Sequence, residues 1–342
     1  MTSRWLSTTL RTVTVCAALA GCGGSLSDQD DLNVVVKVNG VQVAGPLHAD
    51  ATQPITVASG DQVVFESATE VSYSLGMTQV EAPDSSHDDR SYQAKLTSVV
   101  GGSAQMMVTS GVDASDRLTV KLIVQPQAFV NRTWSVGETL IQDYIYRVET
   151  ERYTRHVTAV HDLGSYSIET DVNAWGRYTD SYDADSNHTY FRFDDLSGSD
   201  YPEDSWCSES PGLLIKSFPL FVGKQWDSEW DSECVFEETW HHMARNRVVG
   251  YETVTVPAGT FQVLHIVSDQ SIRYPSGELK FPTRTECWWS VDFQQDVKCD
   301  DWEITNGVPS ELNQSVQAVQ LAGQAAAASG AATPNRTALH KR

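Results

Sequence analysis

No run of 18–20 apolar residues occurs in this 342-residue sequence, so no segment is predicted to cross a bilayer as a helix. Basic residues are also few, because 24 Lys and Arg stand against 45 Asp and Glu, which gives a formal net charge of −21. Nucleic acids and anionic membrane surfaces would repel such a chain, so the composition argues against binding to either. Hydrophobic residues still make up 40% of the chain, enough for the cores of about two domains.

The sequence also lacks several common catalytic motifs. The sequence contains no Gly-x-Ser-x-Gly elbow, no Gly-x-Gly-x-x-Gly fingerprint, no phosphate-binding loop and no His-Glu-x-x-His pair. The histidines lack a metal-binding spacing, because His156 and His161 would face opposite sides of a strand, as would the adjacent His241 and His242. We therefore predict that the protein is not an enzyme. A carboxylate-dependent hydrolase is the alternative, since the many acidic residues allow chance pairs.

Tryptophan is missing from residues 31–126, although the chain has ten. This region alternates apolar and polar residues in short runs, and Asn39-Gly40 is typical of a type I′ hairpin turn. About seven such strands at 8–12-residue spacing predict an immunoglobulin-like β-sandwich.

The rest of the chain has a different composition. Residues 127–310 are again β in pattern but hold nine tryptophans, so we predict a larger antiparallel domain. Within it, Val256-Pro257-Ala258-Gly259 predicts a turn that joins two strands. Residues 311–342 are predicted to form a short Ala-rich and Gln-rich helix, ending near residue 328, and then a disordered tail. The predicted fold class is all-β.

The N-terminus has the pattern of a targeting segment. A cationic start is followed by a short apolar run that ends in Leu19-Ala20-Gly21-Cys22, which resembles the lipobox of bacterial lipoproteins. The resemblance implies that residues 1–21 are a signal peptide, that Cys22 carries lipid, and that residues 22–30 are a tether. Because Gly23 is not the aspartate that retains such proteins at an inner membrane, it also implies an outer-membrane address. An ordinary secretory signal is the alternative.

Four further cysteines suit an exported chain, in which two disulfides would form. Cys287 and Cys299 are predicted to lie on the two arms of a hairpin with its tip at residues 292–295, which places them opposite each other. Cys207 and Cys234 then pair by elimination. A zinc site built from all four cysteines is the alternative, although no Cys-x2-Cys pair is present.

Residues 210–305 carry a second resemblance. Phe218-Pro219-Leu220-Phe221-Val222-Gly223, the segment 254–261 and the pair Trp288-Trp289 occur in this order. The arrangement resembles mostly uncharacterised bacterial envelope proteins. It implies a strongly curved antiparallel sheet, similar to the half-barrels of lipoprotein carriers, and says little about chemistry.

Two acidic patterns are candidates for Ca²⁺. In residues 226–234 the tetrad Trp-Asp-Ser-Glu occurs twice, so a strand would carry Trp226 and Trp230 on one face and four carboxylates on the other. The weak match to a calcium loop is formed by Asp183, Asp185, Asn187 and Asp194. We predict instead a solvated strand face and a hairpin tip, and no bound cofactor.

The tryptophans give the best indication of function. Trp226, Trp230, Trp288 and Trp289 are the candidate ligand-binding residues, because aromatic rings can line a hydrophobic site or stack on sugars. We predict a non-catalytic, lipid-anchored protein of the cell envelope, facing the periplasm or the surface. Its second domain would bind an envelope protein or a hydrophobic ligand such as a lipid. A polysaccharide-binding module is the alternative, and it would need exposed, coplanar tryptophans.

Overall fold

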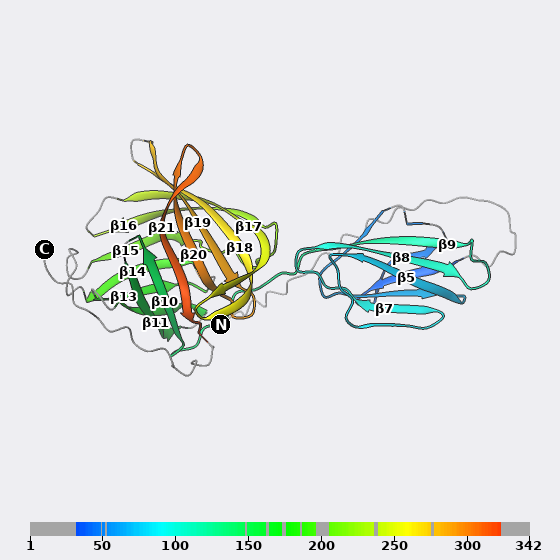
Figure 1. Cartoon of the computed structure of the whole chain (residues 1–342). Coiled ribbons are helices and arrows are strands. Elements are labelled where there is room, and N and C mark those ends of the chain that lie inside the picture. Colours follow the sequence, from blue (N-terminus) through cyan, green and yellow to red (C-terminus); the bar gives the residue numbers. More distant parts are fainter. Residues whose placement is uncertain are drawn as a thin grey trace, which may run out of the picture. The chain divides into compact units, whose positions relative to one another are not determined.

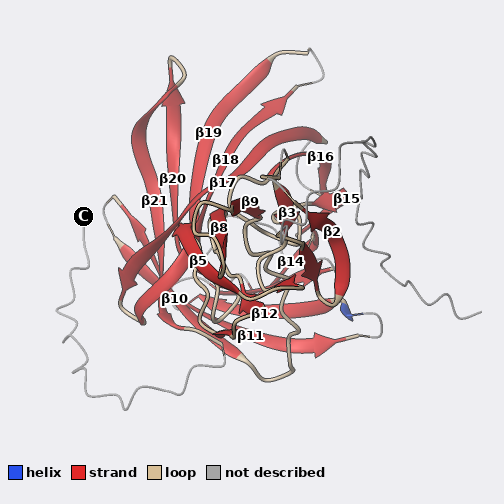
Figure 2. Cartoon of the chain, turned by 90° about the vertical axis from the view of Figure 1, so that its right-hand side faces the viewer, coloured by secondary structure: helices blue, strands red, loops and turns tan. Residues whose placement is uncertain are grey.

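The computed structural model describes residues 32–322 except 49, 52, 148, 162–163, 173–175, 185–186, 196–204, 236–238 and 275–276. The predicted signal peptide, Cys22 and the tether lie outside the described residues. The chain divides into two compact units between Gln127 and Ala128. Both units are built from strands, so the predicted all-β class is confirmed (Figure 2). No helix among the described residues has the length and apolarity needed to cross a bilayer.

The first unit is a sandwich of two sheets, ordered β2-β1-β4-β7-β6 and β3-β9-β8-β5. Buried apolar residues of both sheets meet between them, as Val36 and Phe65 do from one sheet and Met106 and Leu118 from the other. The described strands are β1 (Val34–Val38), β2 (Val41–Leu47), β3 (Ile55–Val57), β4 (Gln62–Ser67), β5 (Val71–Thr78), β6 (Ser85–His87), β7 (Ser91–Lys95), β8 (Gly102–Ser110) and β9 (Arg117–Val124).

The second unit is a closed antiparallel barrel in which each strand pairs with the next (Figure 1). The predicted curved sheet is thus present, and pairing of β10 with β21 closes it on itself. The predicted turn at Val256–Gly259 joins β17 to β18. The twelve described strands are β10 (Thr139–Tyr146), β11 (Thr150–Val160), β12 (Tyr166–Val172), β13 (Gly176–Tyr182), β14 (His188–Asp195), β15 (Trp206–Leu213), β16 (Gln225–Cys234), β17 (Trp240–Val256), β18 (Gly259–Arg273), β19 (Leu279–Ser290), β20 (Gln295–Thr305) and β21 (Val308–Gln320).

The helix predicted to begin at residue 311 is wrong. This part of the chain belongs to β21, which pairs with β20 on one side and β10 on the other. Val316 and Ala318 are buried on one side of the strand. Hydrogen bonds to two neighbouring strands and burial outweigh the helix propensity of Ala and Gln, which is only a few tenths of a kcal/mol per residue. Residues 323–342 lie outside the described part of the chain.

The segment between β15 and β16 packs against interior residues of the barrel. Leu220 is fully buried and exchanges backbone hydrogen bonds with Phe129. Phe218 contacts Trp289 of β19, with ring centroids 5.8 Å apart. The Lys224 ammonium, just before β16, donates hydrogen bonds to the backbone carbonyls of Ser217 and Pro219. These bonds hold the middle of the segment against its C-terminal end. We call residues 214–219 the plug segment.

Candidate functional site

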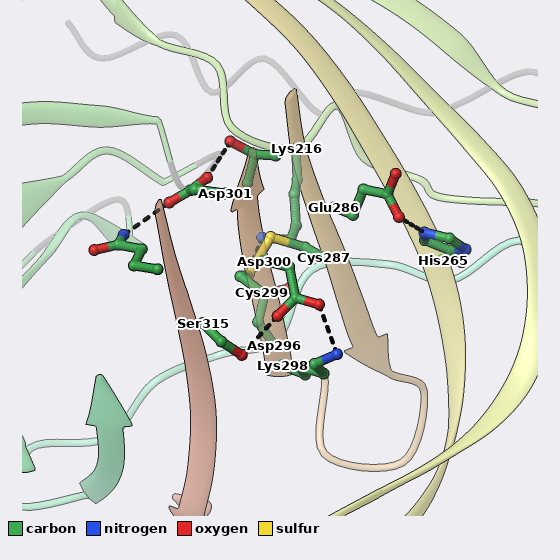
Figure 3. The surroundings of a disulfide bond; sticks show 12 residues. Lys216, His265, Glu286, Cys287, Asp296, Lys298, Cys299, Asp300, Asp301 and Ser315 are labelled. Atoms are coloured by element: carbon green, nitrogen blue, oxygen red, sulfur yellow. Dashed lines mark hydrogen bonds and ion pairs between the residues drawn. A yellow bond between two sulfur atoms is a disulfide. The ribbon is translucent and has the colours of Figure 1, made fainter. Parts of the chain in front are cut away.

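Both predicted disulfides are present in the barrel. Cys207 is bonded to Cys234 across the β15–β16 pair, and Cys287 to Cys299 across the β19–β20 pair. Around the second bond, Asp300 accepts a hydrogen bond from Ser315 at 2.6 Å and contacts Lys298 at 2.6 Å (Figure 3). The bonds fix neighbouring strands to each other.

These disulfides also settle the zinc alternative. Within the described ranges, one group of three potential metal ligands comes close together, and it consists of Cys287, Asp296 and Cys299. Two of its members are joined in a disulfide, so they offer no thiolate. The four-cysteine zinc site is therefore wrong.

The repeated tetrad lies on β16 with the predicted alternation. Asp227, Glu229, Asp231 and Glu233 are exposed, whereas Trp230 is only 4% exposed. His241 on β17 reaches across this acidic face, with its Nδ1 2.8 Å from the Asp231 carboxylate. The four carboxylates of β16 thus form a solvated strand face, as predicted.

The candidate tryptophans do not form one exposed surface. Trp230 stacks on His242 with centroids 4.9 Å apart, and Trp289 is 1% exposed. Trp288 precedes Trp289 on β19 and so points to the other face of the sheet, where it donates from Nε1 to Glu252 at 2.6 Å. His265 and Lys298 lie against its ring at 4.7 and 4.4 Å.

The calcium-loop pattern occurs at the tip of the β13–β14 hairpin, as the hairpin interpretation predicts. The Asp183 carboxylate accepts hydrogen bonds from the backbone N–H and the side-chain amide of Asn187, at 2.9 and 2.8 Å. Asp185 lies outside the described residues, and so does the side chain of Asp194. These contacts link the two ends of the hairpin tip to each other.

Two cavities lie against strands of the barrel, and residues of the plug segment line both of them. The first has a volume of about 190 Å³ and lies against β10–β13 and Trp289. The second has about 200 Å³ and lies against β15–β19. Ile215 and Lys216 line both cavities, so the two cavities adjoin at these two residues.

The first cavity, which we call the polar cavity, has three cations in its lining. Each has a carboxylate partner: Arg132 pairs with Glu138 at 2.7 Å, Arg155 with Asp180 at 2.8 Å, and Lys216 with Asp296 at 2.6 Å. Of the three carboxylates, only that of Asp296 belongs to the described lining itself. The full lining is Asn131, Arg132, Trp134, Leu140, Gln142, Arg155, Tyr166, Ile168, Tyr182, Ile215, Lys216, Phe218, Trp289, Gln294, Gln295 and Asp296.

Local contacts hold these cations in place. The Arg132 guanidinium lies over Trp134, 4.1 Å from the ring centroid. Burial lowers the pKa of Arg132, and the charge of Glu138 opposes this effect. Burial would also lower the pKa of Arg155, but the neighbouring Tyr182 and Asp180 groups raise it well above its ordinary value. Both guanidinium groups therefore remain charged.

The second cavity, which we call the apolar cavity, has a different chemistry. Lys216 is the one charged residue of its described lining, and hydroxyl and amide groups supply the remaining polarity. The full lining is Leu213, Leu214, Ile215, Lys216, Ser228, Ala244, Asn246, Ile266, Ser268, Gln270, Thr285 and Cys287.

A half-buried acidic group lies elsewhere in the barrel. Burial raises the pKa of Glu209, and the charge of His188 partly opposes this. The His188 ring is hydrogen-bonded to Asp180 at 3.2 Å. Glu209 lines neither cavity, and the described lining of the polar cavity holds one carboxylate, Asp296. The geometry therefore gives no support to the paired carboxylates that glycoside hydrolysis requires.

The cavity-lining residues were not predictable from the sequence, because they come from strands far apart in the chain and form no motif. One signal was available: Lys216 follows the apolar run Leu213-Leu214-Ile215. Of the candidate tryptophans, only Trp289 lines a cavity.

No protein-family model and no curated protein matches the chain. Two solved structures show a distant structural likeness to part of the chain. A protein from Bacteroides fragilis, described as exported and as having a YmcC-like fold, matches 57% of this chain and 99% of its own, with 14% identity and a TM-score of 0.37. A protein from Parabacteroides distasonis, described as a lipoprotein, matches 58% of this chain and 100% of its own, with 12% identity and a TM-score of 0.37. Both likenesses are distant, and no functional conclusion rests on them.

Proposed function

We propose that this chain is a lipid-anchored, non-catalytic protein of the bacterial cell envelope that binds a small hydrophobic ligand inside its barrel. One observation carries the binding function: two cavities meet at Ile215 and Lys216 and together amount to about 390 Å³. Each cavity alone is below the usual range for ligand pockets, roughly 300–1,000 Å³, and the two together fall within it.

The lipobox-like Leu19-Ala20-Gly21-Cys22 supports the envelope address. The two disulfides support export independently, because such bonds persist in oxidising compartments. Intact-mass measurement of the exported chain tests this part. We expect the chain to begin at Cys22 with added acyl mass, and an unmodified Cys22 would contradict the anchor.

Binding is tested with 1-octanol as the hydrophobic probe. Ala244 lies on β17 in the wall of the apolar cavity and is 5% exposed, so Ala244→Leu places its extra carbons in the space that the probe would occupy. The matched control is Val249→Leu on the same strand, where the side chain is 47% exposed.

We expect 1-octanol to raise the melting temperature of the wild type and of the control, because a ligand that binds only the folded state stabilises it. The same probe should leave the melting temperature of Ala244→Leu unchanged. Equal shifts in all three proteins, or no shift in the wild type, would refute binding inside the barrel.

A further inference from the structure

We infer that the ligand is a single-chain amphiphile with an anionic head, held with its tail in the apolar cavity and its head at Lys216 in the polar cavity. This inference rests on the proposed function and specifies the ligand of the same site.

The tail is assigned to the apolar cavity. Leu213, Leu214, Ala244 and Ile266 form the apolar part of its wall, and its polar groups, apart from Lys216, are uncharged. A cavity of about 150 Å³ holds one benzene molecule, which has six carbons. The 200 Å³ available here would by the same proportion hold a tail of about eight carbons.

The head is assigned to the polar cavity because of its charges. Although the whole chain carries a net charge of −21, the described lining of this cavity holds three cations and one carboxylate. The carboxylate partners of Arg132 and Arg155, which are Glu138 and Asp180, are absent from that lining. A ligand in the cavity therefore meets the positive members of these two pairs first.

Lys216 connects the two assignments. Its side chain is 12% exposed and lines both cavities. An anionic head that contacts Lys216 in the polar cavity is therefore next to the apolar cavity, where the tail would lie. An ammonium group has three N–H donors, and Asp296 accepts from Lys216 at 2.6 Å. The remaining donors can bind a carboxylate head. Ile215, the neighbouring residue of the plug segment, is 37% exposed.

Calorimetric titration of the full mature chain with matched eight-carbon probes tests the inference. We expect octanoate to bind at least tenfold more tightly than 1-octanol, and octylamine, which is cationic at pH 7, to bind more weakly than either. Hexanoate should bind about fifteenfold more weakly than octanoate. This factor corresponds to two methylene groups at about 0.8 kcal/mol each, with 1.4 kcal/mol per tenfold change.

The variant Lys216→Met/Asp296→Asn tests the position of the head. Both partners are changed together because a single change would leave a buried charge without its partner. We expect the preference of this variant for octanoate over 1-octanol to fall at least threefold below that of the wild type, with some preference left because Arg132 and Arg155 still line the cavity. Its 1-octanol affinity should stay within threefold of the wild type. Lys280→Met is the control, since Lys280 is exposed on β19 and lines neither cavity.

The outcomes separate the two proposals. If 1-octanol binds as tightly as octanoate to the wild type, the anionic head is wrong and the hydrophobic site stands. If neither probe binds, the proposed function fails as well. If the double variant is folded by circular dichroism and keeps the full wild-type preference for octanoate, Lys216 is not the contact of the head. The probe comparison in the wild type decides the head charge even if the variant does not fold.

Discussion

Removal of the Arg155 side chain is expected to destabilise the barrel strongly. Arg155 on β11 donates to the Asp180 carboxylate on β13 at 2.8 Å, and their side chains are 16% and 8% exposed. The same guanidinium nitrogen lies 3.2 Å from the Tyr182 hydroxyl. In Arg155→Met, the Asp180 carboxylate would stay buried without its cation.

The size of the effect follows from this burial. Loss of one partner of a buried ion pair costs about 3–5 kcal/mol in unfolding free energy. His188 would still contact Asp180 at 3.2 Å, so we expect a value near the lower limit, about 3 kcal/mol. In Arg155→Met/Asp180→Leu no buried charge is left alone, so its unfolding free energy should lie within about 1 kcal/mol of the wild type.

Tryptophan emission during urea unfolding is a selective assay. From Cys22 onward, the tryptophans of the chain lie between Trp134 and Trp302, so the emission reports on the barrel unit. For a unit of this size, a loss of 3 kcal/mol also lowers the melting temperature by about 6–12 °C. A loss below about 1 kcal/mol in Arg155→Met, or a double variant as unstable as the single one, would show that the pair is not buried in solution.

Two further predictions concern other parts of the barrel. Replacement of Cys287 and Cys299 by Ser should lower the unfolding free energy by about 3 kcal/mol in the chain-entropy model, because the bond closes a loop with a sequence separation of 12. A loss below about 1 kcal/mol, measured by urea unfolding, would contradict this. Burial is the main cause that lowers the pKa of His242, with His241 adding to the effect and Asp231 opposing it. The unfolded state therefore binds the proton more readily, and stability is lost as pH falls below the ordinary value of about 6.5. His242→Phe, which keeps a ring on Trp230, should gain stability relative to the wild type between pH 7.5 and 5, and an unchanged difference would contradict the assignment.

Local features of the fold were predictable from the sequence. The alternation along β16 follows from strand geometry alone, because neighbouring side chains point to opposite faces. The pairing of Cys287 with Cys299 follows from a hairpin whose arms are close in sequence. In both cases the residues that decide the structure lie within a dozen positions of each other.

Features that depend on distant parts of the chain were not predictable in this way. The strand at Val308–Gln320 has a helix-like composition. Its conformation is decided by its pairing with β10, which lies at the opposite end of the barrel unit in the sequence. The candidate site is similar. Arg155 and Trp289 line the same cavity although 134 positions separate them in the sequence, and no spacing rule relates them.

The number of strands provides a physical reason for the cavities. A barrel of about eight strands has an interior that its own side chains fill, and a wider barrel leaves space that water, a ligand or a plug must occupy. This barrel has twelve described strands, and the plug segment enters the space that they enclose. The Lys216 and Asp296 side chains are 12% and 25% exposed, and a well-packed apolar pair in place of such an ion pair is often neutral or stabilising, so stability alone does not explain it. A contact with the head group of a ligand would explain why a charged pair lies in this space. The comparison of octanoate with 1-octanol tests this role.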